Sequence, residues 1–319
     1  MKTLQELKRK IKERAKELGF DNTGFSSFAT LKEETKLLKK WLQKGFHGEM
    51  KYLEKNMDKR EDISLLLPNA KSVISLTFNY YPKKKPPEKN NYKISKYAYG
   101  EDYHTVIKEK LWEIIRFIKE HYPDTAARPF VDSAPVFDKA WAVKSGLGWI
   151  GKNTLLIQPK KGSFFFTGEI ITDLDIPADN QEMENHCGSC TRCIDACPTG
   201  ALEAPYRLNA NRCISYLTIE YKGNDFPEEL QGKLNDWIFG CDICQDVCPY
   251  NIKFAVPTKE KRFDPDPSLM EMDKNKWHGL TKEEFNRMFK KSAVKRTKYE
   301  GLIRNIRFVA DKSSENRLL

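Results

Sequence analysis

Apolar positions in the first half of the chain follow two different periods. In some segments they recur every three or four residues, which is typical of helices, and Gly19 ends the first such segment. In others, β-branched and aromatic residues form short runs bounded by turn-forming residues, which is typical of strands. Helices are predicted over residues 4–18, 31–44, 103–121 and 136–144. Strands are predicted over residues 22–26, 72–78, 128–132 and 164–172.

The pattern changes after Pro177, where a cysteine-rich segment begins. Strands that alternate with helices before this point indicate a mixed domain, and we expect an α+β fold overall. The expected organisation is an α/β domain over residues 1–177, a cysteine-rich domain over 178–256 and a basic helical segment over 257–319. The sequence Thr281-Lys282-Glu283-Glu284 has the form of a capping box that opens a helix in the last segment.

Positive charge is concentrated near the C-terminal end of the sequence. The formal net charge is +10, and residues 281–319 carry eleven Lys or Arg against five acidic residues. A basic face of this kind attracts polyanions, nucleic acid first, although a solvated helix face accounts for it equally well. No run of apolar residues is long enough for a membrane span, and the N-terminus does not read as a secretory signal, so we expect a cytoplasmic protein.

All eight cysteines lie between Cys187 and Cys248, in two groups with short spacings. The first group, Cys187-x2-Cys190-x2-Cys193-x3-Cys197-Pro198, is the bacterial ferredoxin run, in which the fourth cysteine binds the other cluster of a pair. The second, Cys241-x2-Cys244-x3-Cys248-Pro249, lacks one early cysteine, and Cys213 completes the count. The spacing predicts two [4Fe–4S] clusters. One would take Cys187, Cys190, Cys193 and Cys248, and the other Cys213, Cys241, Cys244 and Cys197.

Zinc is the alternative occupant of these thiolates, because Cys-x2-Cys pairs also suit tetrahedral sites. Zinc does not account for the repeated runs of three cysteines or for the proline that follows each last cysteine. A two-cluster protein needs only about a fifth of this length, so the preceding 180 or so residues are expected to bind whatever receives the electrons. No dinucleotide fingerprint or phosphate-binding loop is present to suggest a nucleotide cofactor.

Several separate blocks of the sequence resemble the epoxyqueuosine reductases, over residues 60–251. These blocks are Val131–Pro135, Ala140–Ala142, Gly146–Thr154, Gly168–Thr172, Cys213–Thr218 and Gly240–Pro249. The resemblance implies a nitroreductase-like domain that binds cobalamin, beside a ferredoxin-like domain with two clusters. It also implies two-electron reduction of the epoxide of epoxyqueuosine, in the wobble position of tRNA, to queuosine. Many members carry C-terminal HEAT-like repeats, of which residues 257–319 leave room for a remnant at most.

The resemblance also implies roles for individual residues. Asp132 is expected to donate a proton to the alkoxide of the opened epoxide, which requires burial to raise its pKa; without the resemblance it would be taken for the N-cap of the next helix. Arg60, Ser95, Lys96 and Ser215 match positions near the cobalamin. Asp132 is also expected to contact the cobalamin. Lys152, Asn153 and Thr154 could hydrogen-bond its amide groups, and the nearby glycines could admit a bulky ligand or simply form a turn.

The expected partners are tRNA that carries epoxyqueuosine and an external single-electron donor, with no membrane and a monomeric chain. Two alternatives use the same cysteines: a cobalamin enzyme of the reductive dehalogenase type, and a non-catalytic iron–sulfur electron carrier. The second leaves the first 180 or so residues without a role. His104 is interpreted as a helix-start residue rather than a ligand of iron or cobalt.

Overall fold

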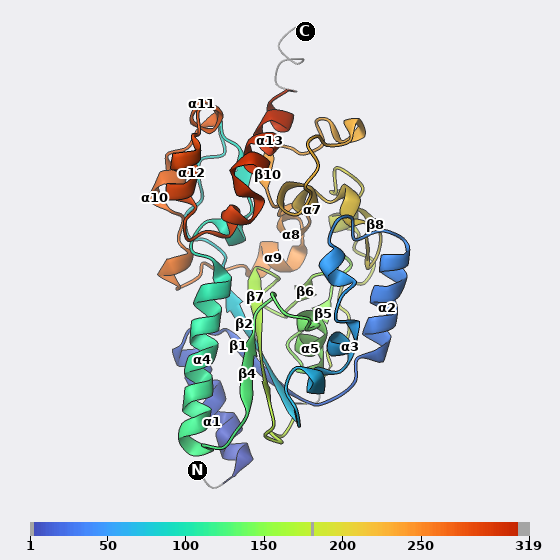
Figure 1. Cartoon of the computed structure of the whole chain (residues 1–319), viewed down its shortest axis with the longest axis vertical. Coiled ribbons are helices and arrows are strands. Elements are labelled where there is room, and N and C mark those ends of the chain that lie inside the picture. Colours follow the sequence, from blue (N-terminus) through green and yellow to red (C-terminus); the bar gives the residue numbers. More distant parts are fainter. Residues whose placement is uncertain (1–2, 180–181, 312–319) are drawn as a thin grey trace.

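A four-stranded antiparallel sheet forms the centre of the first half of the chain (Figure 1). We analysed a computed structural model, which describes residues 3–179 and 182–311. The strands lie in the order β1 (Asn22–Ser27), β2 (Ser72–Asn79), β7 (Phe165–Thr172) and β4 (Ala127–Phe130). Each neighbouring pair is antiparallel, so the expected α+β class is confirmed and the sheet is not a parallel α/β sheet.

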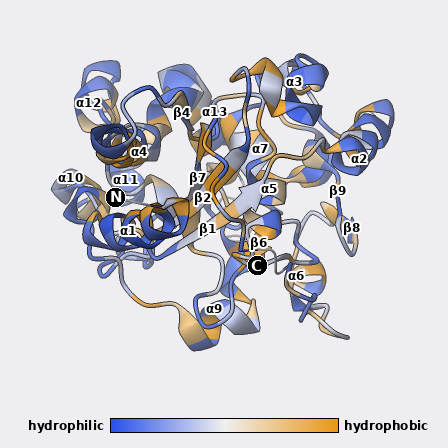
Figure 2. Ribbon diagram, turned by 90° about the horizontal axis from the view of Figure 1, so that it is seen from below, coloured by the Kyte–Doolittle hydropathy of each residue, from blue (hydrophilic) through white to orange (hydrophobic). Residues whose placement is uncertain are grey.

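Helices cover both faces of this sheet (Figure 1). One face packs against α1 (Leu4–Glu17) and α4 (Tyr103–His121), whose apolar stripes lie in a common core with β2 and β7. The other face packs against α5 (Asp138–Lys144), where Trp141 is fully buried. Farther out lie α2 (Lys32–Gln43) and α3 (Met57–Glu61). Figure 2 shows the hydrophobic colour gathered on the central strands, while the outer turns of the helices are hydrophilic.

The predicted elements of this half are present, with small differences at their ends. The helix predicted over 103–121 has those bounds, and the four predicted strands differ from the observed ones by no more than two residues at either end. The helix predicted from residue 136 begins at Asp138 instead, because residues 132–135 form a turn before it. The short pair β5 (Trp149–Ile150) and β6 (Leu156–Ile157) was not predicted, since two-residue strands carry almost no periodic signal.

The second half of the chain consists of short helices joined by irregular segments. The cysteine-rich part contains α6 (Arg192–Asp195), β8 (Leu202–Ala204), β9 (Arg207–Leu208), α7 (Ile214–Ile219), β10 (Trp237–Phe239), α8 (Ile243–Asp246) and α9 (Pro249–Phe254). The C-terminal part contains α10 (Pro267–Met270), α11 (Lys274–His278), α12 (Lys282–Met288) and α13 (Lys298–Ala310). The capping box at Thr281 and Glu284 is confirmed at the start of α12. Residues 312–319 of the predicted helical segment lie outside the described residues.

The three sequence segments share cores rather than forming separate bodies. Strand β10 pairs in parallel with β3 (Lys93–Ile94), so the second half adds a strand to an early part of the chain. A single hydrophobic cluster joins Ile94 and Phe239 to α11, α12 and α13. The C-terminal helices are therefore part of the folded core. Within the described ranges, every helix is too short or too polar to cross a lipid bilayer.

Asn305 links α13 to both neighbouring elements and gives a test of this arrangement. Its side chain is fully buried and donates to the carbonyls of Thr218, at 2.9 Å, and Ile238, at 2.8 Å. Replacing Asn305 by Ala leaves both carbonyls buried without these donors, which should lower the free energy of unfolding by about 2–4 kcal/mol. The urea midpoint measures this loss, and the exposed Arg307→Ala change on the same helix is the control. An unchanged midpoint for Asn305→Ala would show that α13 is not anchored here.

Candidate active site and cysteine groups

A cavity of about 220 Å³ opens between β7, α5 and the start of α4. Its polar lining includes Tyr103, Asp132, Asp138, Lys139, Ser163 and Thr167, and its apolar lining includes Phe165 and Phe166. Several titratable groups therefore converge on a space with an aromatic wall, which is a common arrangement in active sites. The sequence-based assignment placed Asp132 in such a site, and the structure places it at this cavity.

Asp132 lies just after β4, in a backbone conformation that aspartate seldom adopts. Its φ is +50°, in the left-handed region, and its side chain is 63% exposed. The residue that caps α5 is Phe137, and no side chain in the described residues caps that helix, so the N-cap interpretation of Asp132 is wrong. Strained backbone at a cavity is typical of functional sites.

Two side chains from the first turn of α4 hold the Asp132 carboxylate. The Tyr103 hydroxyl donates to its Oδ2, and His104 Nε2 lies 3.6 Å from the same oxygen. On its other side, His104 Nδ1 lies 2.8 Å from Oδ1 of Asp102, which also caps α4. The Tyr103 ring stacks on Phe166, with centroids 4.1 Å apart. His104 is thus a helix-start residue, as expected, but it also bridges two aspartates.

This bridge reverses the protonation expected at Asp132. Although the Asp132 side chain is exposed to the cavity, the protein around it would by itself raise its pKa, but the contact with His104 and the hydrogen bond from Tyr103 outweigh this effect and lower the pKa. The expectation of a raised pKa is therefore wrong. Burial would lower the pKa of His104, yet the hydrogen bond to Asp102 and the contact with Asp132 raise the pKa to about 9. At neutral pH the proton is held on His104, and Asp132 is ionised.

Two further carboxyl groups, those of Asp138 and Glu169, lie near Asp132. Glu169 on β7 is fully buried, and neither of its carboxyl oxygens has a donor among the described residues; the same is true of Asp138 Oδ1. The carboxyl groups of Asp138 and Glu169 act on each other, and one can donate to the other only if the pair holds a proton. Burial is the main cause that raises the pKa of Asp138 to about 7 and the pKa of Glu169 well above its usual value.

The eight cysteines fall into two spatial groups. Cys193 interacts electrostatically with Cys187, Cys190 and Cys248. Cys241 interacts in the same way with Cys213 and Cys197, and Cys244 chiefly with Cys213 and Cys241. Cys244 also interacts, more weakly, with Cys193 of the first group, so the two groups are neighbours. Within the described residues, no three His, Cys, Asp or Glu side chains converge closely enough to hold a single metal ion. The four thiolates of a cubane each bind a different iron atom and need no such convergence.

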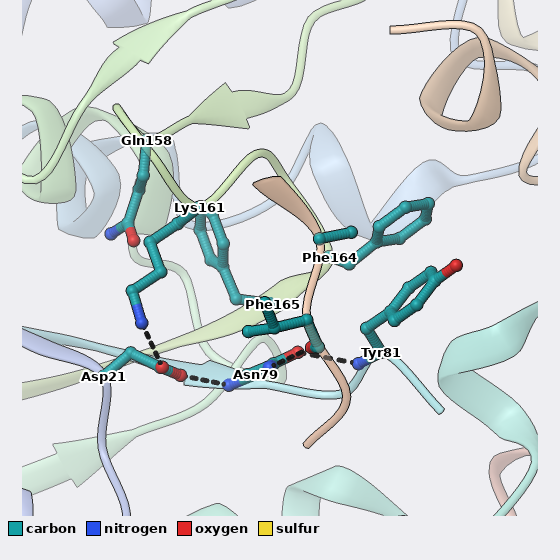
Figure 3. Close-up of a pocket in the computed structure, with 9 residues that line it drawn as sticks. Asp21, Asn79, Tyr81, Gln158, Lys161, Phe164 and Phe165 are labelled. Atoms are coloured by element: carbon teal, nitrogen blue, oxygen red, sulfur yellow. Dashed lines mark hydrogen bonds and ion pairs between the residues drawn. The ribbon is translucent and has the colours of Figure 1, made fainter. Parts of the chain in front are cut away.

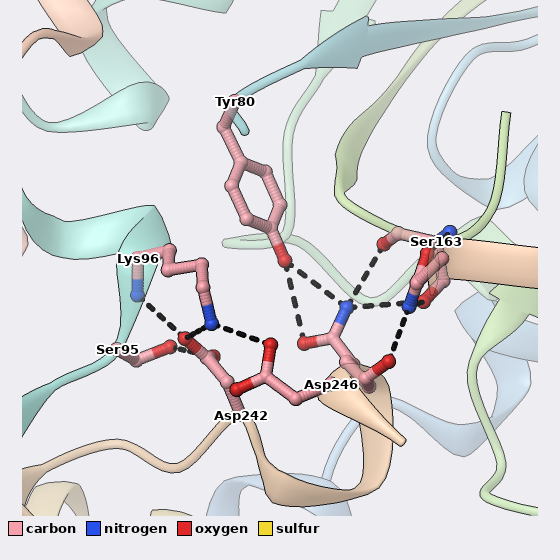
Figure 4. Close-up of polar contacts among 8 residues, drawn as sticks. Tyr80, Ser95, Lys96, Ser163, Asp242 and Asp246 are labelled. Carbon is pink, nitrogen blue, oxygen red and sulfur yellow. Dashed lines mark hydrogen bonds and ion pairs between the residues drawn. The ribbon is translucent and has the colours of Figure 1, made fainter. Parts of the chain in front are cut away.

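A buried ion pair fixes the second cysteine group against the first half of the chain (Figure 4). Asp242, between Cys241 and Cys244, accepts hydrogen bonds from Ser95 Oγ, from Lys96 N at 2.8 Å and from Lys96 Nζ at 3.2 Å. Lys96 Nζ also donates to Asp246 at 2.6 Å. The side chains of Ser95 and Lys96 are thus engaged within the chain, and their assignment to cobalamin stays a prediction.

The other residues assigned to cobalamin lie in several places. Arg60 is buried, with its Nε unpartnered among the described residues, and it acts electrostatically on Asp138. Lys152 Nζ donates to Gly188 O at 2.6 Å, and Asn153 Nδ2 to Cys244 O at 3.4 Å, so both lie beside the cysteine segments. Thr154 has a φ of +66°. The remaining residue, Ser215, donates its backbone N–H to the thiol of Cys213.

The glycines of the predicted ligand-binding stretch serve the packing of the chain itself. Gly146 follows α5 in the left-handed region, with a φ of +71°. A Cβ on Gly148 would lie 2.2 Å from the carbonyl oxygen of Ile157 on β6. The turn interpretation of these glycines therefore accounts for the structure. A small cavity of about 10 Å³ lies beside Asp21, which accepts hydrogen bonds from Asn79 and Lys161, and it shares only Phe165 with the lining of the larger cavity (Figure 3).

Sequence reasoning missed five residues of the site: Tyr103, His104, Asp138, Glu169 and Asp242. Of these, His104 was interpreted only as a helix-start residue. Glu169 carries the clearest signal, because it is a lone carboxyl within an otherwise apolar or small strand over residues 164–172. Asp242 lies in the loop between Cys241 and Cys244, and no periodic pattern of apolar residues there indicates that its side chain is buried. Tyr103 and Asp138 become neighbours of Asp132 only through the packing of α4 and α5 at one end of the sheet.

Comparison with known proteins gives two sequence-profile matches. Residues 186–251 match a 4Fe-4S double cluster binding domain, and residues 60–133 match the profile "Epoxyqueuosine reductase QueG, DUF1730". The first match supports two [4Fe–4S] clusters over zinc.

Whole-chain relatives are also found. An epoxyqueuosine reductase from Cellulophaga algicola is 54% identical over 94% of this chain and 96% of its own length. One from Escherichia coli is 39% identical, over 95% of this chain and 80% of its own length. The crystal structure of an epoxyqueuosine reductase with an epoxyqueuosine-modified tRNA stem loop matches with a TM-score of 0.89 at 32% identity, over 96% of this chain and 81% of that chain.

The grouping of the cysteines predicts the effect of removing Cys213. Replacing Cys213 by Ala removes one thiolate from the second group only, so the reconstituted protein should lose about half of its iron and acid-labile sulfide. Iron and sulfide analysis after anaerobic reconstitution measures the loss. Ser189→Ala, an exposed change inside the Cys187–Cys190 loop, is the control and should keep the full content. Full iron content in Cys213→Ala would remove Cys213 from the ligand set.

Proposed function

The chain belongs to the epoxyqueuosine reductase family, and from this premise we propose that it reduces the epoxide of epoxyqueuosine in tRNA to queuosine. The observation that carries the proposal is the position of Asp132 at a cavity that adjoins the second cysteine group. Ser163 lines this cavity, and Gln245, the residue after Cys244, donates from Nε2 to Ser163 O at 3.0 Å and to Ser163 Oγ at 3.1 Å. The acid–base groups and the electron source thus meet at one place.

The two clusters would deliver electrons one at a time from an external donor. The group of Cys197, Cys213, Cys241 and Cys244 adjoins the cavity through Asn153 and Gln245, so it is the proposed exit. The group of Cys187, Cys190, Cys193 and Cys248 is then the entry. The reaction is proposed to take place in the cytoplasm, on a monomeric chain.

Cobalamin is the cofactor that the family implies, and one buried group near Asp138 fits it. Arg60, which acts electrostatically on Asp138, has an Nε without a hydrogen-bond partner among the described residues, and its guanidinium is suited to the amide carbonyls of a corrin. The proposed contacts are Arg60, Ser95, Lys96, Asp132, Lys152, Asn153, Thr154 and Ser215. When bound, cobalamin would supply the low-potential cobalt centre that passes electrons to the epoxide.

The proposed proton donor is Asp132 acting together with His104. Because Asp132 is ionised at rest and His104 holds a proton, the proton reaches the substrate from His104 through the Asp132 carboxyl. Asp102 fixes the orientation of the ring by its 2.8 Å contact with Nδ1, which leaves Nε2 directed at Asp132. Tyr103 holds the carboxylate in place. A positioned acid of this kind lowers the barrier to opening the epoxide, since the developing alkoxide is protonated as it forms.

The tRNA would approach from the side of Tyr52 and Arg296. Arg296, Asp132 and Arg60 act electrostatically on the hydroxyl of Tyr52, which places Tyr52 near Asp132. Its side chain is 48% exposed, so its ring is available for stacking with a base. Part of the basic C-terminal charge serves the fold instead. Arg304 donates to the carbonyls of Leu217, Tyr221 and Gly223 at 2.7–3.2 Å, which removes it from any contact with phosphate.

The proposal is tested with protein reconstituted anaerobically with iron, sulfide and cobalamin, given epoxyqueuosine-containing tRNA and a chemical one-electron donor. Nucleoside analysis should find queuosine. Asp132→Asn should keep the cofactor spectra but lower turnover about 10²–10⁴-fold, because the amide cannot pass the proton. Asp124→Asn, an exposed change in the loop before β4, is the matched control. If the intact wild-type protein forms no queuosine, the proposed function is wrong.

The proton held on His104 predicts a pH dependence. The raised pKa of His104 means that the proton is present at neutral pH and is lost as the pH rises through about 9, so kcat should fall over that range. His104→Gln should lower kcat at neutral pH about 10²-fold and remove this alkaline limb. His121→Gln, at the far end of α4, should keep it. A lower rate with an unchanged pH profile in His104→Gln would assign His104 a structural role only.

A further inference from the structure

Conversion of epoxyqueuosine to queuosine consumes two protons, and this inference rests on the proposed function. Epoxyqueuosine carries one bridging oxygen more than queuosine, so reduction breaks both C–O bonds, forms a C=C bond and releases the oxygen as water. The two electrons come one at a time through the clusters. Both protons end on the departing oxygen: one as the ring opens, the other as the hydroxyl group leaves. His104 and Asp132 account for one proton.

The carboxyl pair of Asp138 and Glu169 is placed to hold the other proton. Glu169 lies on the same face of β7 as Thr167 and Phe165, which line the cavity, because side chains two residues apart on a strand share a face. Gly168, between Thr167 and Glu169, faces the opposite side of the sheet, toward Ile107 and Leu111 of α4. Asp138 lines the cavity itself, in the first turn of α5. The pair therefore reaches from the buried sheet to the reaction space.

The contact between the two carboxyl groups requires a proton. Glu169 is fully buried, and within the described residues no N–H or O–H group donates to either of its oxygens or to Asp138 Oδ1. Two ionised carboxylates in contact without donors repel each other strongly, whereas one shared proton turns the contact into a hydrogen bond. The pKa values of both groups are raised accordingly, chiefly by burial.

We propose that the carboxyl pair of Asp138 and Glu169 stores one proton beside the cavity and delivers it through Asp138 to the oxygen that leaves as water. The step moves one proton and no electrons: the O–H bond of the shared proton breaks, a new O–H bond forms on the departing oxygen, and the pair is left with two negative charges. Water that enters the opened cavity after product release restores the proton.

The surrounding charges act on the pair in opposite directions. The charged groups that face the pair are Asp132 from the β4–α5 connection, Lys139 from α5 and Arg60 from α3. Asp132 opposes ionisation of the pair while it is itself ionised, and Arg60 and Lys139 favour ionisation of Asp138. Lys139 Nζ lies 2.9 Å from Thr154 O, which fixes its position. The pair thus holds its proton in the resting enzyme, where Asp132 is ionised.

Glu169→Gln is the decisive variant. The amide can still donate a hydrogen bond to Asp138, so the packing is retained, but the pair has no proton to deliver at neutral pH. We expect kcat at pH 7 to fall about tenfold or more, with little change in KM for the tRNA. The midpoint at which activity falls with rising pH should move to lower pH, because Asp138 then titrates beside a neutral amide and loses its proton more readily.

A second measurement does not depend on activity. Infrared difference spectra of the wild-type protein without cobalamin, recorded at neutral pH in H₂O and D₂O, should show the carbonyl band of a protonated buried carboxyl, and Glu169→Gln should lack it. Asp138→Asn, which removes the cavity-side member, should also lower kcat. Glu260→Gln is the matched control: Glu260 is an ionised, partly buried carboxylate paired with Lys110 at 2.9 Å, away from the cavity lining.

The outcomes separate this inference from the proposed function. Queuosine formation by the wild-type protein, together with a wild-type kcat and pH midpoint in Glu169→Gln, would overturn the proton store and leave the proposed function intact. A missing carboxyl band in the wild-type protein would also overturn it. If Glu169→Gln is slower but keeps the wild-type midpoint, the pair is structural and the proposal is wrong. Absence of queuosine with the wild-type protein would overturn the function itself.

Discussion

The buried carboxylate of Asp242 is the interaction on which the geometry of the site depends. It lies between two cysteines of the second group, is fully buried, and accepts three hydrogen bonds from Ser95 and Lys96 of the first half of the chain. A charge taken out of water is stabilised only if it is paired and fully hydrogen-bonded, and Lys96 and Ser95 meet both conditions. The pairing fixes where the second cysteine group stands relative to the cavity. The neighbouring Gln245 and Asn251 extend the same contact to Ser163.

The sequence predicted those features whose cause is local. The helix at residues 103–121 and the capping box at Thr281 each depend on residues a few positions apart, and both are present. Features that depend on distant contacts were not predictable: the parallel pairing of β3 with β10, and the burial of Asp242 by Lys96. The direction of the pKa shift of Asp132 was predicted wrongly. The prediction considered only burial, because the contact with His104 depends on the packing of α4 against the end of β4 and cannot be inferred from the sequence.

The count of basic residues overstates the surface available to RNA. Arg304 has its guanidinium against three backbone carbonyls and 4.6 Å from the ring centroid of Phe226, so it stabilises the junction of α13 with α7. Arg296 pairs with Glu220 at 2.6 Å, which offsets its charge beside the cavity. Charges used in this way contribute to folding and to the shape of the site rather than to attraction of phosphate.

The two proton stores differ in their surroundings, and Asp132 couples them. His104 is 30% exposed and lies between the carboxylates of Asp102 and Asp132, so it holds its proton as a cation, while Asp138 and Glu169 share theirs in a buried pair. The negative charge of Asp132 favours the proton on both. Asp132 loses this charge only while it carries the proton from His104 to the substrate, and it is ionised again afterwards, so it does not drive release from the pair. The pair gives up its proton only to the stronger base that forms as the second C–O bond breaks, which places this transfer after opening of the ring.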